Sequence, residues 1–174
     1  MVRLFFFLQI FISSNLLALT QSFIVRNISV QIKIPEDWKF TENFLDVPLT
    51  ITGPKKDGFN PYIGIIDSGD LEKMIYPSKI EEVLTETANT EIDNLKKANY
   101  LDPQITLVGK SEKKEDALLY QIKLEYGMNQ YRYYETIYYL YCNKGYLSLY
   151  TRVRSDHKEY EDTIYEILDN IKCL

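Results

Sequence analysis

The fold of this 174-residue chain is decided by residues 131–154, which read YRYYETIYYLYCNKGYLSLYTRVR. In the stretch 131–142, tyrosines and aliphatic residues occupy odd and even positions alike. A strand that is apolar on both faces is covered on both sides, which places this stretch inside a sheet. The residues Asn143-Lys144-Gly145 then predict a tight hairpin into a second strand at 146–154.

Outward from this hairpin, the sequence shows two periodicities. Apolar residues at spacings of three and four predict a helix from Ser78 to about Asn99, with Ser78 and Glu81 as its capping box. The same spacing predicts a final helix that Ser155 caps and that runs to about Ile171. A period of two, typical of half-buried strands, recurs in five shorter stretches: 28–34, 47–52, 62–67, 104–110 and 118–126.

These elements predict the order βββ-α-ββββ-α. Successive strands joined by short turns pair antiparallel, and an amphipathic helix needs a sheet on which to bury its apolar stripe. The predicted fold class is therefore α+β, a mostly antiparallel sheet with helices on its faces. About 150 residues remain once the N-terminal segment is set aside, a length that matches one ordinary domain.

Two short motifs add a resemblance to a known family. Residues 32–38 read Ile-x-Ile-Pro-x-x-Trp, and the loop 53–61 contains Gly-Pro and ends in Asp-Gly-Phe-Asn-Pro before a strand. Together with a helix, a strand meander and a C-terminal helix, they resemble the PsbP-like superfamily. Its members include an extrinsic photosystem II subunit, a nuclear Ran-binding protein and bacterial envelope proteins. The resemblance implies an α/β/α sandwich over 23–174 and a non-enzymatic binding or assembly role, with no shared catalytic residues.

The N-terminus reads as a secretory signal peptide over residues 1–22. Arg3 supplies the positive start, Leu4 to Ile12 is almost wholly apolar, and small polar residues follow up to a predicted cut after Ser22. The alternative is an uncleaved membrane anchor, although the apolar run is only about half the ~20 residues that a spanning helix needs. We therefore expect an exported protein, secreted or periplasmic, with 23–174 as its single mature domain.

Charge and histidine content narrow the chemistry. The formal net charge is -5, and the lysines are scattered among acids, so the sequence predicts no nucleic-acid partner. His157 is the only histidine, which excludes His-rich metal sites and leaves no catalytic triad motif around it. We interpret His157 as a solvated residue at the start of the last helix. The sequence predicts no metal, no cofactor and no catalytic residue.

Cys142 and Cys173 are predicted to form a disulfide. The strand 146–153 travels about 26 Å away from the hairpin. The following helix travels about 25 Å back, so both sulfurs arrive at one end of the domain. In an oxidising compartment the bridge would close a loop of about 31 residues, worth about 3.5 kcal/mol in the chain-entropy model. The alternative is two free buried thiols.

Paired carboxylates offer an enzymatic alternative. Glu125 and Glu135 lie on adjacent predicted strands, and Glu135 falls among tyrosines. Two carboxylates at a suitable separation could hydrolyse a carbohydrate. In the competing interpretation each is the cross-strand partner of a cation such as Lys123 or Arg132.

The preferred interaction surface is the loop 55–61, which follows the second predicted strand, because loops on rigid sheets often carry function. In the alternative interpretation the loop is only a connection, and Phe59 covers an edge of the sheet. The tyrosines between Tyr120 and Tyr165 are similarly either cover for the sheet or an aromatic platform for a glycan or peptide. Asn27 begins an Asn-Ile-Ser glycosylation sequon. The predicted binding residues are Lys55, Lys56, Asp57, Phe59, Asn60 and Tyr62.

The sequence thus predicts an exported, non-enzymatic protein that binds or helps to assemble another protein or envelope component. Membrane contact is expected only through an uncleaved N-terminal segment. The alternatives are a carboxylate-based hydrolase and a carrier of a small ligand or weakly held metal ion through oxygen ligands.

Overall fold

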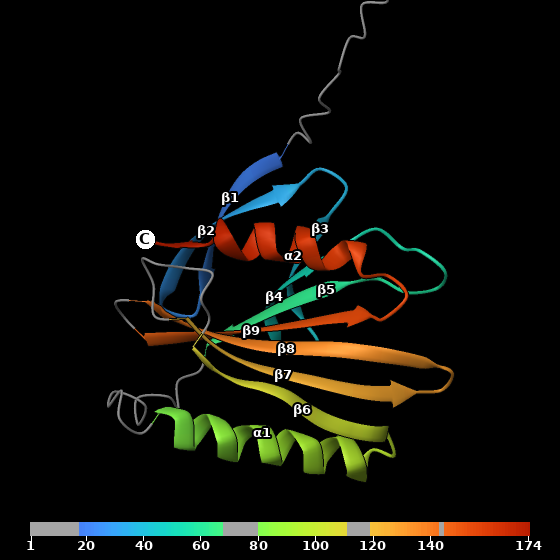
Figure 1. Cartoon of the computed structure of the whole chain (residues 1–174). Helices are drawn as coiled ribbons and strands as arrows, with labels where there is room; N and C mark the ends of the chain where they lie inside the picture. The colour runs from blue at the N-terminus through green and yellow to red at the C-terminus, as the bar shows by residue number, and fades with distance from the viewer. Residues whose placement is uncertain (1–17, 68–79, 111–118, 143–144) are drawn as a thin grey trace, which may run out of the picture.

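The computed structural model describes residues 18–67, 80–110, 119–142 and 145–174 (Figure 1). Within them the chain forms ten strands and two helices. In chain order these are β1 (Ala18–Val25), β2 (Ile28–Pro35), β3 (Lys39–Phe44), β4 (Val47–Thr52), β5 (Tyr62–Asp67), α1 (Ile80–Lys97), β6 (Leu101–Lys110), β7 (Leu119–Met128), β8 (Tyr131–Cys142), β9 (Gly145–Arg154), α2 (Glu159–Asp169) and β10 (Lys172–Cys173).

Seven strands form one antiparallel sheet in the order β3-β4-β5-β9-β8-β7-β6. β8 lies between β9 and β7, and its side chains are buried on both faces over most of its length. This burial confirms the covering predicted for 131–142. The β8–β9 register runs from Cys142 opposite Gly145 to Tyr133 opposite Arg154, so the hairpin sets which side chains of the two strands share a face.

The two helices cover opposite faces of this sheet (Figure 1). Odd residues of β8 such as Ile137 belong to the core cluster of Leu84 in α1, whereas even residues such as Tyr138 belong to the cluster of Ile164 in α2. Alternate side chains of this one strand therefore belong to two separate cores. The predicted α+β class, with helices on both faces, is confirmed.

A smaller sheet closes the α2 side of the molecule. It has the order β1-β2-β10, and β10 places Cys173 opposite Val30 of β2. Cys173 is bonded to Cys142 at the end of β8, with a Cα–Cα distance of 5.7 Å. The predicted disulfide is therefore present. Cys173 lies in β10, after α2 has ended, and not in the helix itself.

Three strands were not predicted, namely β1, β3 and β10. β3 is exposed at all six positions, so burial imposes no alternation on its sequence. β10 has only two residues, too few for any periodicity. β1 overlaps the segment interpreted as a signal peptide.

The N-terminal predictions fall mostly on residues 1–17, which lie outside the described part of the chain. In β1 only Phe23 and Val25 are buried, so a cut after Ser22 would keep both buried residues in the mature chain. Cleavage and the alternative anchor both stay predictions. Neither α1 nor α2, the helices of the described residues, has the length and apolar composition needed to span a membrane. Asn27 of the sequon is exposed between β1 and β2.

The start of the last helix differs from the prediction. α2 begins at Glu159 after Lys158, whose side chain makes no capping hydrogen bond, so Ser155 is not the cap. The Ser155 amide instead donates to the Arg132 carbonyl, and the His157 amide donates to the Arg154 carbonyl. The first bond continues the pairing of β9 with β8, and the second closes a turn between β9 and α2. The predicted capping box and the hairpin turn at 143–144 rest on residues outside the described set.

Candidate functional site

The loop between β4 and β5, residues 53–61, is closed at its neck. The Gly53 amide donates to the Pro61 carbonyl at 2.9 Å, and the Asn60 side-chain amide donates to the Gly53 carbonyl at 3.0 Å. A Cβ at Gly53 would lie 2.6 Å from Pro61 and 2.9 Å from Trp38. Only glycine fits this close approach of the loop to Trp38.

The tip of the same loop is a tight turn. The amides and carbonyls of Lys56 and Phe59 exchange two hydrogen bonds of 2.9 Å. Asp57 and Gly58 between them have φ values of 46° and 79°, a pair of positive angles typical of a type I′ turn. The Arg154 guanidinium donates to the Asp57 carbonyl at 3.1 Å. The turn is therefore held from the end of β9, far away in sequence.

Arg154 and His157 form the buried base of this loop. Their side chains are 3% and 2% exposed, and Arg154 Nη2 lies 2.6 Å from His157 Nε2. Because a guanidinium only donates, Nε2 must accept, which assigns the ring hydrogen to Nδ1. The imidazole also stacks on the Phe59 ring, with centroids 6.2 Å apart.

The interpretation of His157 as a solvated helix-start residue is wrong. Its ring is enclosed by Arg154 and Phe59, which arrive from β9 and from the 53–61 loop. Its Nδ1 faces Glu159 Oε1 at 3.5 Å, beyond ordinary hydrogen-bond length, and is buried without a hydrogen-bond partner. Burial of this ring depends on tertiary contacts that its polar sequence neighbours do not reveal.

The six predicted binding residues divide into two groups. Lys55, Lys56 and Asp57 are exposed, and Lys56 Nζ lies 2.6 Å from Glu159 Oε1. This hydrogen bond lowers the pKa of Glu159 to about 2. The other three serve internal contacts, because Phe59 packs on Tyr133 and His157, Asn60 closes the neck, and Tyr62 lies under Arg152. Of the six predicted binding residues, Lys55, Lys56 and Asp57 are therefore the exposed ones.

Glu135 belongs to a buried polar cluster on the α1 face. Its Oε2 accepts hydrogen bonds from Arg152 Nη2 at 2.9 Å and from the Tyr126 hydroxyl at 2.8 Å. Burial raises the pKa of Tyr126, and the neighbouring Glu135 charge raises it further, so the phenol stays a neutral donor. Arg152 was missed as the partner, although counting outward from the hairpin turn pairs Glu135 with Arg152.

Glu125 lies on the other face of the sheet. It is opposite Tyr134, whereas Glu135 is opposite the adjacent residue Leu124, so the two carboxylates point to opposite sides. Glu125 Oε1 accepts from Arg132 Nη2 at 2.8 Å, the partner that the ion-pair interpretation named. The sheet separates the two groups, so this pair cannot flank one glycosidic bond.

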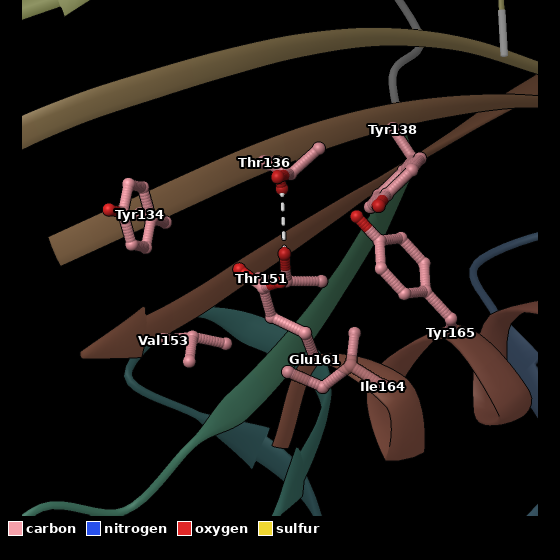
Figure 2. A pocket seen from close by; sticks show the side chains of 8 residues that line it. All are labelled: Tyr134, Thr136, Tyr138, Thr151, Val153, Glu161, Ile164 and Tyr165. Atoms are coloured by element: carbon pink, nitrogen blue, oxygen red, sulfur yellow. Dashed lines mark hydrogen bonds between the residues drawn. The ribbon is translucent and has the colours of Figure 1, made fainter. Parts of the chain in front are cut away.

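A groove of about 250 Å³ opens on the α2 face. Tyr134 and Thr136 of β8 form its floor, and Glu161 and Tyr165 of α2 form one wall. A smaller pocket of about 20 Å³ shares Tyr134, Thr136, Glu161 and Tyr165 with the groove and is also lined by Thr151 and Ile164. Figure 2 shows this smaller pocket, with the α2 side chains reaching toward β8. The remaining lining residues of the groove are Thr106, Lys123, Leu124, Glu135 and Lys158.

No sequence signal indicated this groove, because β6, β7, β8 and α2 each contribute only one to three polar residues to it. Within the described residues, no group of three or more His, Cys, Asp or Glu side chains could hold a metal ion. The groove is therefore a set of hydroxyls, two lysines and two carboxylates built on the sheet and α2.

Comparison with solved protein structures identifies the fold of this chain. No protein-family model and no curated protein matches the chain. The structure of LpqN from Mycobacterium tuberculosis, involved in cell envelope biogenesis, is similar at a TM-score of 0.61 with 18% identity, over 90% of this chain and 91% of LpqN. Cyanobacterial PsbP from Synechocystis sp. PCC 6803 is similar at a TM-score of 0.57 with 8% identity, over 83% and 86%. The chain has a PsbP-like fold, as the sequence motifs implied.

Proposed function

We propose that this chain is an exported, non-catalytic binding protein that engages another component of the cell envelope through residues 55–57. Three features support this proposal. The fold is similar to that of an envelope biogenesis protein, the disulfide suits an oxidising compartment, and the loop presents exposed charges on a rigid base.

The observation that carries the proposal is the preorganisation of the 53–61 loop. Its neck is closed by backbone and Asn60 hydrogen bonds, and its tip is held by Arg154 through the Asp57 carbonyl. A loop already fixed in one conformation loses little entropy on binding, so exposed Lys55 and Asp57 are suited to docking.

Site-specific crosslinking tests this surface. A photo-crosslinking amino acid replaces Lys55 in one protein and Lys97, at the end of α1, in a matched control, each expressed in the organism that makes the protein. We expect a discrete adduct from position 55 alone. Adding Gly58→Ala should weaken the adduct, because Gly58 has a φ of 79° and open space around it, so the change strains only the turn.

Two outcomes would contradict the proposal. Equal adducts from positions 55 and 97, or none from either, would remove the loop as the docking surface. A glycan whose mass changes on incubation with the protein, and stays unchanged with Glu135→Gln, would establish a catalytic role instead.

Export is tested separately by the mass of the protein isolated from its natural source. We expect a mature chain that begins at Phe23. Recovery of a cytosolic product that retains Met1 would overturn the proposed compartment.

A further inference from the structure

Two lysines line the groove on the α2 face, each held over a tyrosine ring. Lys123 Nζ lies 5.8 Å from the Tyr165 ring centroid and donates to the Tyr165 hydroxyl at 3.2 Å. Lys158 Nζ lies 5.6 Å from the Tyr134 ring centroid. These rings position the two ammonium groups through cation–π contacts without neutralising them.

Neither Lys123 nor Lys158 has a carboxylate partner among the described residues, whereas several other cations of the domain do. Lys56, Arg132 and Arg152 are paired with Glu159, Glu125 and Glu135 at 2.6 to 2.9 Å. Two unpaired cations that share one groove repel each other, and an oxyanion bound with them would relieve this repulsion.

Two carboxylates also line the groove, and one of them, Glu135, is paired with Arg152. The other, Glu161, lines both the groove and the smaller pocket beside it, and it has no ion-pair partner among the described residues. A purely anionic ligand would be repelled by Glu161, and a purely cationic ligand would be repelled by Lys123 and Lys158. The complementary ligand carries one oxyanion and one ammonium group.

We infer that this groove binds a small zwitterion. Its phosphate or carboxylate lies at Lys123 and Lys158, its ammonium lies at Glu161, and the hydroxyls of Tyr134 and Tyr165 offer further hydrogen bonds. This chemistry is shared by free amino acids or phosphoamines and by the headgroup of an aminophospholipid. The site is independent of residues 55–57, so the failure of one proposal leaves the other intact.

Titration of the full chain with matched probes tests the charge pattern. O-phosphoethanolamine and γ-aminobutyrate carry both charges, whereas inorganic phosphate and ethanolamine carry one each. We expect the best zwitterion to bind at least about tenfold more tightly than either single-charge probe, since it forms charge-assisted contacts at both ends. Chemical-shift changes should centre on Tyr134 and Tyr165.

Charge-removing variants locate the site. Lys123→Met and Lys158→Met keep the aliphatic stem over the ring and should each weaken zwitterion binding about tenfold. Lys97→Met, on the helix that covers the opposite face, is the matched control and should bind like the unmodified protein. Glu161→Gln should abolish the preference for the zwitterion over phosphate. Thermal unfolding of each variant confirms that a loss of binding is not a loss of fold.

Vesicles distinguish the two sources of the zwitterion. Phosphatidylethanolamine presents a primary ammonium that can donate to Glu161, and phosphatidylcholine does not. Binding to phosphatidylethanolamine vesicles that Lys123→Met abolishes would identify the lipid headgroup, and soluble binding alone would identify a free zwitterion. Zwitterions that bind no better than phosphate or ethanolamine, or a Lys97→Met loss equal to the Lys123→Met loss, would overturn the inference.

Discussion

The two faces of the seven-stranded sheet are built from the same strands but are stabilised differently. On the α2 face, the apolar cluster extends into the small sheet and is tied by the disulfide between Cys142 and Cys173. On the α1 face, the cluster formed by the described residues is smaller and lies beside the ion pair of Glu135, which is buried, and Arg152, which is partly buried. The α2 face is thus closed by apolar burial and a covalent bond and carries its charges around the groove, whereas the α1 face holds an ion pair beside its apolar cluster.

The α1 face tolerates this charge because its tyrosines supply neutral donors. Burial raises the pKa of Tyr139 and of Tyr126, so both hydroxyls stay protonated at neutral pH. The Tyr126 hydroxyl and the Arg152 guanidinium together satisfy Glu135. The comparison teaches that alternation along β8 permits two chemistries within one strand, because adjacent side chains never share a face.

The largest expected loss of stability comes from removing the disulfide on the α2 face. Replacing Cys142 and Cys173 by alanine opens a loop whose ends are 31 residues apart, and should lower the free energy of unfolding by about 3.5 kcal/mol. Urea unfolding measures the loss, and hydrogen exchange should rise in β10 and α2 more than in α1. Reduced unmodified protein is the control, since it loses the bond without losing the side-chain sulfurs. Exchange that rises first in α1 would contradict this assignment.

A somewhat smaller loss of stability is expected from removing the ion pair on the α1 face. Arg152→Met leaves Glu135 buried without its cation and should cost about 3 kcal/mol in urea unfolding. The double variant with Glu135→Leu should recover most of this loss, because it removes the uncompensated charge.

The matched control for the buried pair lies on the opposite face. Arg132→Met removes the partner of Glu125, but the Arg132 side chain is 39% exposed, so the expected cost is below about 1 kcal/mol. If Arg132→Met and Arg152→Met were equally destabilising, the distinction between the two faces would fail.

The smallest expected effect is on the pH dependence of stability, and it arises at the solvent-exposed start of α2. Hydrogen bonding from Lys56 lowers the pKa of Glu159 from its ordinary 4.5 to about 2. A carboxyl with a lowered folded-state pKa stabilises the fold above pH 4.5, and this contribution disappears as the pH falls toward 2. Lys56→Met should therefore flatten the fall in urea midpoint over this window. Lys55→Met, which removes an exposed neighbour, should leave the pH profile unchanged.

Much of the fold was predictable from particular stretches of sequence. Apolar residues at both parities of 131–142 predicted a doubly covered strand, and the rises of β9 and the last helix predicted that the two cysteines meet. The edge strand β3 escaped prediction because none of its side chains is buried. The local sequence around Ser155 suggested a cap, but its amide bonds to the Arg132 carbonyl of β8, and α2 begins only at Glu159.

The candidate sites were less predictable, because their residues come from distant parts of the chain. The loop that contains residues 55–57 was predicted as an interaction surface, but the support from Arg154 spans 97 residues and has no local signal. Lys123 lies in β7, whereas Lys158 and Glu161 lie three residues apart at the start of α2, and these two polar stretches meet only in the folded groove.

The sequence alone determined the hairpin at 131–154, the helical periodicities and the pairing of the only two cysteines. Periodicity is a local property, and the lengths of the strand and helix between the cysteines can be counted along the chain. Tertiary structure decided which charged groups became buried, which face each carboxylate points to, and which lysines stay without a partner. These outcomes depend on strand register and on contacts between distant segments, and a change of one residue in register would exchange every side chain between the two faces.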